Sequence, residues 1–316
     1  MVSAAQLRFA PVTVEAPAST ANLGPGFDSL ALALELYLRV TVTPLEFGAE
    51  QLVVEGEGAD EIGLDAGNRF LIGLEHGLQH FGLEPPVMRI EMSNDIPLAR
   101  GLGSSAAASV AGLLAAEALA GTSLGEERVH AIATDIDGHP DNVAAALWGG
   151  FVLVGRDDQG VPRSARFAPP STLHAALFVP DTPLRTVEMR AALPAHVSHA
   201  DAAHNVGRAA LVVAAMTADR LDLLSAMSDD RLHEPYRVEH FPALPELEAA
   251  ATAAGARGAA LSGAGSTVIA LCDDAEVAQR AAEAMVEAAA RHGLAGRPMV
   301  LRPTAHGARV TTQRPA

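Results

Sequence analysis

The apolar and polar positions of this 316-residue chain form short alternating and helical patterns that follow one another along its length. Alternation predicts strands over residues 9–16 and 30–43, which end at Pro17 and Pro44. Residues 68–82 place apolar side chains at helical spacing and end on Gly82. The same reasoning predicts further strands at 51–56, 88–92 and 151–154, and helices at 106–120, 124–134 and from about 143 to Gly149.

The polar stretch 155–171, with its glycine and prolines, is typical of a domain boundary. After it, the pattern predicts strands at 175–179, 258–271 (broken by a loop at 261–267) and 299–302, and helices at 201–218, 221–228, 244–254 and 275–292. This order of elements predicts an α+β fold in which the second domain is a split βαβ unit. We assign residues 1–160 to the first domain and 161–316 to the second.

Composition excludes several classes of protein. The formal charge of −16 argues against a nucleic-acid partner, which would require a basic surface. No apolar run approaches the roughly 18 residues of a membrane span, and residues 1–10 lack the pattern of a signal peptide. A single cysteine, Cys272, cannot form an intrachain disulfide, which fits the reducing cytoplasm. We therefore expect a cytoplasmic protein that acts without nucleic acid or membrane.

Glycines and serines interrupt the pattern at residues 96–108, between a predicted strand and an alanine-rich predicted helix. A glycine-rich loop that opens a helix directs unpaired N–H groups and the positive end of the helix dipole at one point, where an anion can bind. The chain contains no lysine, which excludes a P-loop. Backbone N–H groups, hydroxyls and Mg²⁺ would then have to attract a phosphate. Taken alone, the segment could equally be a tight turn before a buried helix.

Three other segments accompany this loop: residues 16–28, 138–143 and 261–268. Together, and in this order, the four segments resemble the motifs of the homoserine kinases, a branch of the GHMP kinase superfamily. The resemblance extends from about Phe9 to Leu271, which is most of the chain. It implies the GHMP kinase fold, with an N-terminal α/β domain like the second domain of ribosomal protein S5 and a ferredoxin-like split βαβ C-terminal domain.

The resemblance also implies an activity: ATP-dependent phosphorylation of L-homoserine to O-phospho-L-homoserine, in threonine biosynthesis, by a cytoplasmic transferase that could be a homodimer. Two alternatives stay open. One is a GHMP kinase with a different alcohol as acceptor, and the other is a non-catalytic, nucleotide-binding relative. A kinase of this kind uses ATP and Mg²⁺, and its catalysis consists mainly of positioning and charge stabilisation.

By the same resemblance, the nucleotide site falls on the central loop. The residues implied in binding ATP are Pro97, Leu98, Ala99, Arg100, Gly101, Leu102, Gly103, Ser104, Ser105, Ala106 and, near the adenine, Asn68. Asn68 could equally be the N-cap of its helix. Ser105 and Asp137 would hold Mg²⁺. The family has glutamate where this chain has Asp137, which is one methylene shorter, so a bridging water or Asp135 could take over the contact.

The acceptor site is implied on residues distant in sequence. Asn22, Asp28, Arg190, Arg237 and Gly263 match substrate-binding positions, with the arginines suited to a carboxylate and Asp28 to an ammonium. The expected catalytic residues are His139, Asp141, Asn142 and Thr186. Many relatives in the superfamily have an aspartate base where this chain has Asn142. We therefore expect the phosphate itself, or water, to assist deprotonation while Asn142 orients the hydroxyl.

Overall fold

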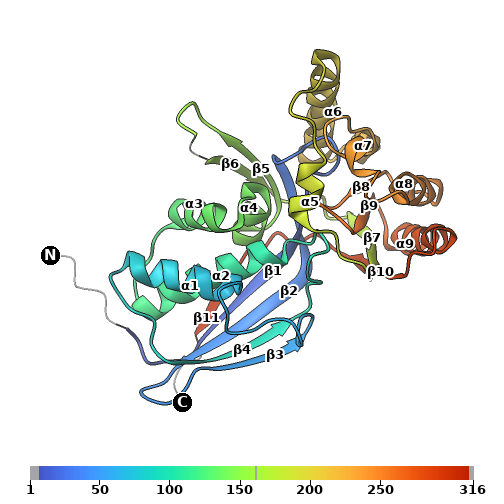
Figure 1. Ribbon diagram of the computed structural model, residues 1–316. Helices are drawn as coiled ribbons and strands as arrows, with labels where there is room; N and C mark the ends of the chain where they lie inside the picture. Colours follow the sequence, from blue (N-terminus) through green and yellow to red (C-terminus); the bar gives the residue numbers. More distant parts are fainter. Residues whose placement is uncertain (1–6, 161, 313–316) are drawn as a thin grey trace.

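The computed structural model describes residues 7–160 and 162–312, which form two β-sheets with helices packed against them (Figure 1). The larger sheet has seven strands, of which five follow the order β11-β1-β2-β4-β3, while β5 pairs with β2 and β6 pairs with β5. Its strands are β1 (Val12–Ala21), β2 (Leu30–Pro44), β3 (Gln51–Gly56), β4 (Met88–Asn94), β5 (Phe151–Arg156), β6 (Pro162–Phe167) and β11 (Arg309–Thr312).

Strand β1 runs through Pro17 and continues to Ala21, so the prediction that it ends at the proline was wrong. Its pairing with β2 changes register between Pro17 and Ala18. Proline lacks the N–H that a regular ladder requires, and strands accept it at such irregularities. The continuation of β1 matters for the site, because it carries Ser19 and leads directly to Asn22.

Four helices cover one face of the larger sheet (Figure 1): α1 (Arg69–His80), α2 (Ser104–Ala120), α3 (Glu126–Asp137) and α4 (Pro140–Trp148). Helix α1 buries Phe70, Leu74 and Leu78, which confirms the helical spacing found in the sequence. Helix α2 is apolar on nearly all sides, as expected of a helix enclosed by protein, and its N-terminus follows the glycine-rich loop.

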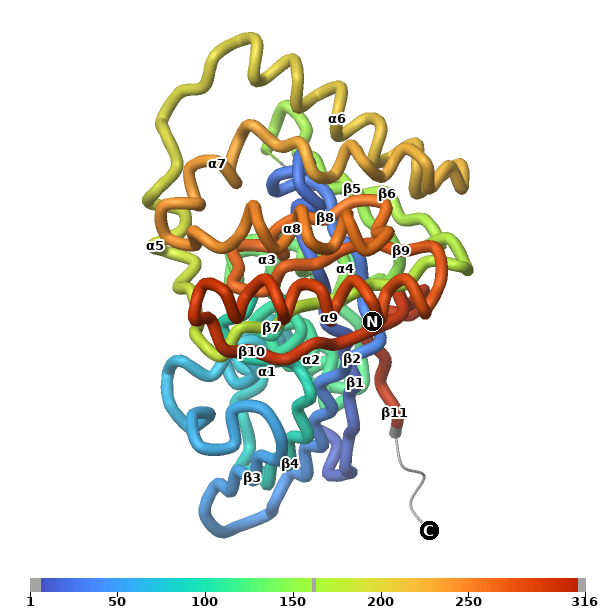
Figure 2. Tube along the Cα trace, turned by 90° about the vertical axis from the view of Figure 1, so that its right-hand side faces the viewer, coloured from blue at the N-terminus to red at the C-terminus, as the bar shows by residue number. Residues whose placement is uncertain are grey.

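The smaller sheet has the strand order β10-β7-β9-β8, all antiparallel, in which β7 is followed by helices, β8, β9, a helix and β10. This is the arrangement of a split βαβ unit, as predicted. The strands are β7 (His174–Pro180), β8 (Gly258–Leu261), β9 (Val268–Cys272) and β10 (Gly296–Leu301). The helices are α5 (Thr186–Ala191), α6 (His199–Thr217), a 3₁₀ helix at Leu221–Ser228, α7 (Glu234–Arg237), α8 (Leu244–Ala253) and α9 (Ala275–Arg291), and Figure 2 shows α8 and α9 side by side across the sheet.

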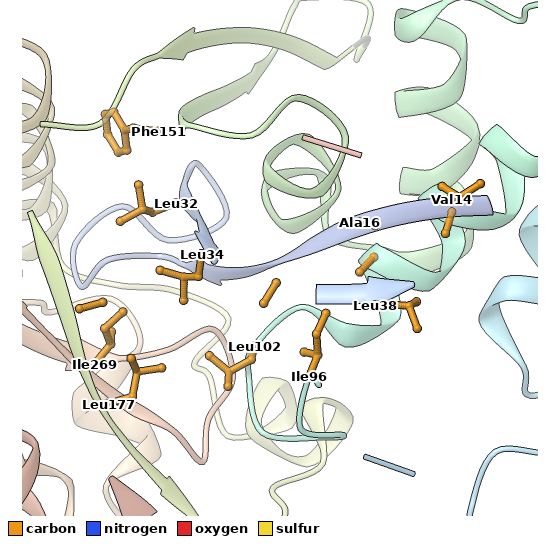
Figure 3. Packing of buried hydrophobic residues seen from close by; sticks show 14 of the residues in the cluster. Val14, Ala16, Leu32, Leu34, Leu38, Ile96, Leu102, Phe151, Leu177 and Ile269 are labelled. Atoms are coloured by element: carbon orange, nitrogen blue, oxygen red, sulfur yellow. The ribbon is translucent and has the colours of Figure 1, made fainter. Parts of the chain in front are cut away.

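The two sheets share one hydrophobic core. Val14 and Leu34 from the larger sheet belong to the same buried cluster as Leu177 and Ile269 from the smaller one (Figure 3). Leu102, from the glycine-rich loop, is buried in this cluster as well. Because the loop is anchored where the sheets meet, groups from both halves of the chain can converge on it.

Two strands of the larger sheet were not predicted. Strand β6 lies inside the segment interpreted as a boundary and forms a hairpin with β5, and β11 returns near the end of the chain to pair with β1. The division into residues 1–160 and 161–316 stays a prediction, and in this topology it would place two strands of the larger sheet on the far side of the boundary. Within the described residues, no helix is long and apolar enough to cross a membrane.

Candidate active site

A cavity of about 530 Å³ lies where the two sheets meet. It brings together segments that are far apart in sequence, among them the loop after β1, the glycine-rich loop with the start of α2, the start of α4, α5 and the loop after β8. Nearly all the predicted site residues line it, namely Asn22, Asp28, Pro97, Ala99, Arg100, Gly101, Leu102, Gly103, Ser104, Ser105, Ala106, Asp137, His139, Asp141, Asn142, Thr186, Arg190, Arg237 and Gly263. Leu98 and Asn68 are not among the lining residues.

The glycine-rich loop is held in a backbone conformation that larger residues would not tolerate. Gly101 and Gly103 both have positive φ, at 76° and 70°. A Cβ at Gly101 would lie 2.0 Å from the Ser262 carbonyl oxygen, and one at Gly103 would lie 2.1 Å from the Ser19 Oγ. Glycine is therefore required at both positions for the loop to pack between the two halves of the chain.

Helix α2 begins at Ser104 with its first N–H groups available to a ligand. Among the described residues, no side chain caps this end, and the first turn contains no acidic residue. The earliest intrahelical bond is donated by the Ala107 N–H to the Gly103 carbonyl, at 2.9 Å. The unpaired N–H groups and the helix dipole thus face the cavity together, which is the arrangement that binds phosphate at helix N-termini.

The Arg100 side chain tethers this loop instead of reaching toward a phosphate. Its Nε donates to the Pro180 carbonyl at 2.7 Å, one terminal nitrogen donates to the Leu98 carbonyl at 2.8 Å, and the other donates to the backbone carbonyl of Asp181. The guanidinium therefore ties the loop to the end of β7. Arg69, at the start of α1, is a second lining arginine; it donates to the Ile136 carbonyl at 2.8 Å.

A second group of lining residues surrounds Asp28, against which α5 places Arg190. Two guanidinium nitrogens of Arg190 meet the two carboxylate oxygens at 2.6 and 3.1 Å, and its Nε donates to the His139 Nε2 at 3.1 Å. Nδ1 of His139 lies 2.9 Å from the Asp137 carbonyl oxygen. Hydrogen bonding to the Asp137 carboxylate, 3.3 Å away, raises the pKa of His139. Both ring nitrogens are engaged, so the imidazole presents no free base to the cavity.

Arg237, on α7, is the second arginine of this group, and it is almost completely buried. It donates to the Gly263 carbonyl at 2.9 Å and to the His233 Nδ1 at 3.1 Å. Burial lowers the pKa of His233 to about 4 and that of Arg237 to about 10, so the imidazole is neutral and the guanidinium is charged at neutral pH. The Nδ2 of Asn22 donates to the same Gly263 carbonyl at 2.8 Å, which joins the two halves of the site.

Phe27 lies between the two arginines. The guanidinium carbons of Arg190 and Arg237 are 5.5 and 5.6 Å from the centroid of its ring, and the His233 ring stacks on it at 5.1 Å. Cation–π attraction of this kind holds each guanidinium over the aromatic face. The two positive groups are thereby kept beside the same ring in spite of their mutual repulsion.

The first turn of α4 carries Asp141 and Asn142. Burial, followed by the nearby Asp28 carboxylate, raises the pKa of Asp141 to about 6. Its Oδ1 accepts from the Asn142 N–H at 2.8 Å, whereas its buried Oδ2 has no hydrogen-bond partner in the described part of the chain. A buried carboxylate oxygen without a donor is costly, and an ammonium or N–H group of a ligand would satisfy it.

The cavity lining also contains oxygen donors suitable for a divalent cation. Ser105 opens into the cavity from α2, and Asp137 faces it from the end of α3 with a side chain only 6% exposed. A hydroxyl and a carboxylate are the hard donors that Mg²⁺ prefers, and its remaining positions are commonly filled by substrate phosphates and water. The described residues contain no cluster of three or more histidine, cysteine, aspartate or glutamate side chains placed to hold a metal without such help.

Asn68 caps helix α1. Its Oδ1 accepts from the N–H groups of Phe70 and Leu71 at 3.1 and 3.3 Å, and its Nδ2 donates to the Gly63 carbonyl at 2.9 Å. Asn68 is thus the N-cap of its helix, one of the two roles that the sequence left open. A role near the adenine stays a prediction.

Family models agree with this geometry. The GHMP kinases N terminal domain matches residues 68–150, and the GHMP kinases C terminal domain matches residues 212–291. A homoserine kinase of Deinococcus radiodurans is 40% identical over 289 residues, which are 92% of this chain and 93% of the relative. The chain belongs to the GHMP kinase family. A homoserine kinase of Moorella thermoacetica is 39% identical over 93% of this GHMP kinase and 98% of its own length.

Solved GHMP kinase structures are similar over the whole chain. A homoserine kinase from Cytophaga hutchinsonii has a TM-score of 0.85 at 28% identity and covers 97% of this chain and 99% of its own. A mevalonate kinase from L. major, solved with R-mevalonate, has a TM-score of 0.64 at 15% identity, covering 96% and 98%. At 15% identity, the similarity to the mevalonate kinase concerns the fold alone.

Sequence reasoning did not identify the lining residues Phe27 and Arg69 of this GHMP kinase site, nor Ser19, which bonds to Asn142 without lining the cavity. Ser19 and Phe27 lie inside the segment 16–28 that carries the resemblance, yet nothing local distinguishes them from strand or loop residues. The partner of Ser19 is Asn142, which is 123 positions away, and the two arginines beside Phe27 come from the second half of the chain. Only the fold brings these pairs together.

Proposed function

We propose that this chain transfers the γ-phosphoryl group of ATP to the hydroxyl of L-homoserine, giving O-phospho-L-homoserine and ADP. One observation carries the proposal: two arginines and two carboxylates line the same cavity as a glycine-rich loop suited to phosphate. Arg190 and Arg237 suit a carboxylate, and Asp28 and Asp141 suit an ammonium. An α-amino acid with a terminal hydroxyl matches both sets of charges, whereas a neutral alcohol would leave them unmatched.

In this proposal the triphosphate lies on the loop 101–105, where backbone N–H groups and the dipole of α2 balance its charge. Ser105 and Asp137 would hold the Mg²⁺ that accompanies ATP. That cation, when bound, neutralises charge that develops on the transferring phosphoryl group. Asp137 in place of glutamate keeps a carboxylate at this position, and its burial beside the cavity supports a direct or water-bridged contact.

The zwitterion replaces contacts that the protein makes with itself. Asp28 and Arg190 bond to each other, so bound homoserine would insert its ammonium against Asp28 and its carboxylate against Arg190 and Arg237. The unpartnered Oδ2 of Asp141 offers a second acceptor for the ammonium. A cation there would lower the pKa of Asp141 and keep the group ionised at neutral pH.

Phosphoryl transfer needs the hydroxyl oriented in line with the γ-phosphorus, and its proton must leave. An amide such as Asn142 cannot accept that proton, and both nitrogens of His139 are engaged. The hydroxyl oxygen bonds to phosphorus, the bond to the bridging oxygen of ADP breaks, and the hydroxyl proton passes to a phosphate oxygen or water. Asn142 orients the hydroxyl, and Thr186, at the first position of α5, lines the same region.

A coupled assay of ADP release tests the acceptor. Homoserine, mevalonate and galactose are offered at matched concentrations with ATP and Mg²⁺. The proposal requires turnover with homoserine far above that with the other two, because only homoserine matches both arginines and both carboxylates. Turnover with another alcohol and none with homoserine would contradict it.

A cytoplasmic location and a homodimeric state accompany this proposal as predictions. The charge of −16 and the single, buried cysteine support a location in the reducing cytoplasm. Light scattering on the purified full chain measures the mass of the assembly and so tests the dimer directly.

A further inference from the structure

Ser19, on β1, links the phosphate-binding loop to the helix that carries Asn142. It is fully buried and does not line the cavity. Its backbone N–H donates to the Leu102 carbonyl at 3.1 Å, and its Oγ donates to the Oδ1 of Asn142 at 2.9 Å. Gly103 packs directly against the same hydroxyl. One side chain thus contacts both the segment expected to hold ATP and the residue expected to meet the acceptor.

The contacts of Asn142 determine which way its amide faces. Asp141 Oδ1 accepts from the Asn142 backbone N–H at 2.8 Å, and the Asn142 Nδ2 lies 3.4 Å from that same oxygen. Reversing the amide would turn Oδ1 toward a carboxylate oxygen and remove the bond from the Ser19 hydroxyl. The bond from Ser19 therefore favours the orientation in which Oδ1 is satisfied on the protein side and an N–H remains for the cavity.

We propose that Ser19 is a positioning residue for phosphoryl transfer: by holding the Oδ1 of Asn142, it makes that amide present an N–H donor to the acceptor hydroxyl. A hydroxyl oxygen that accepts this N–H must direct its own proton elsewhere, toward the phosphate. The orientation set by Ser19 therefore agrees with proton transfer to phosphate and opposes a geometry in which the amide oxygen captures the hydroxyl proton. The inference rests on the proposed function, in which Asn142 contacts that hydroxyl.

The first test is Ser19→Ala, assayed with the acceptor that the wild-type enzyme turns over most rapidly. Loss of the bond leaves the Asn142 amide free to rotate, and kcat falls about tenfold, the effect of one hydrogen bond of ordinary strength. KM for ATP and for the acceptor changes by less than about twofold, because binding contacts are retained. Ser109→Ala is the matched control: its Oγ is buried on α2 without a hydrogen-bond partner in the described residues, and kcat is unchanged.

A double-mutant cycle with Asn142→Ala separates positioning from a general structural role. If Ser19 acts through Asn142, Ser19→Ala has no further effect on kcat once the amide is absent. A tenfold loss that persists in the Asn142→Ala background, an unchanged kcat in Ser19→Ala, or a rise of KM alone would each overturn the proposal. Because the cycle uses whichever alcohol the wild type phosphorylates, failure of homoserine as the acceptor is a separate result.

Discussion

Replacement of Arg190 by glutamine separates the role of this arginine in substrate binding from its role in stability. Its ion pair with Asp28 is bidentate, but the two side chains are 36% and 37% exposed, so solvent screens the attraction. Such a pair contributes at most about 1 kcal/mol to folding. The melting temperature of Arg190→Gln should therefore fall by no more than a few degrees.

Arg190→Gln should weaken the binding of homoserine far more than it lowers the stability of the fold. A hydrogen bond to a charged group contributes about 1.5–3 kcal/mol, and a carboxylate held by Arg190 loses at least one such bond together with a full positive charge. We expect kcat/KM for homoserine to fall about 100-fold, equivalent to about 2.7 kcal/mol. KM for ATP should stay unchanged, because the Arg190 side chain bonds to Asp28 and His139 in the described part of the chain and not to the loop proposed to bind phosphate.

Propanolamine, which is homoserine without its carboxylate, makes the assay specific. Wild-type enzyme should prefer homoserine strongly, whereas Arg190→Gln should lose this preference and use propanolamine as well as before, since Asp28 is freed for its ammonium. Arg185→Gln, at the N-cap of the same helix, is the control, since Arg185 is 78% exposed and, among the described residues, forms an ion pair only with Glu188, at 3.4 Å. Equal losses on both acceptors, or a parallel rise of KM for ATP, would refute the reasoning.

Three further predictions concern the rest of the site. Folding raises the pKa of Asp141 from 3.8 to about 6, so its ionisation costs stability: the cost is absent below about pH 4, grows as the pH rises to about 6 and is constant above that. Asp141→Asn should therefore gain up to about 3 kcal/mol of unfolding free energy over wild type above pH 6, with a higher melting temperature, and should melt at the wild-type temperature at pH 4, while KM for homoserine rises. Gly103→Ala should abolish ATP binding measured by calorimetry, because the added Cβ meets the Ser19 Oγ at 2.1 Å; retained affinity would show that the loop adapts. Arg69→Gln should weaken the binding of ATP about tenfold and leave the binding of adenosine unchanged, as expected of a guanidinium that faces the phosphates. Equal weakening of the two ligands would instead place this guanidinium at the base or the ribose.

Local patterns in the sequence predicted the elements that bury one clear face. Helix α1 is an example, because the spacing of Phe70, Leu74 and Leu78 gives a single apolar stripe and Gly82 follows its end. Strand β11 could not be found in this way. It is four residues long, and it pairs with β1 while Arg309 bonds to Glu15 at 3.0 Å, so its stability comes from a partner nearly 300 positions away.

The charged groups of the site were identified in the sequence by resemblance, not by pattern. Asp28 and Arg190 are separated by 162 positions, and each taken alone is an ordinary surface charge. The sequence also could not show that the guanidinium of Arg100, in the middle of the loop, donates its hydrogen bonds to backbone carbonyls. Motifs therefore predicted which segments meet, whereas the direction of each side chain depends on contacts between distant segments.

Direct identification of the product tests the central claim. Phosphorus NMR of the purified full chain with ATP, Mg²⁺ and L-homoserine follows ATP, ADP and any new phosphate ester in one sample. The account predicts that O-phospho-L-homoserine appears in equal amount to ADP, and that neither forms when homoserine is omitted. Inorganic phosphate as the only product, or ADP release that does not depend on homoserine, would contradict it.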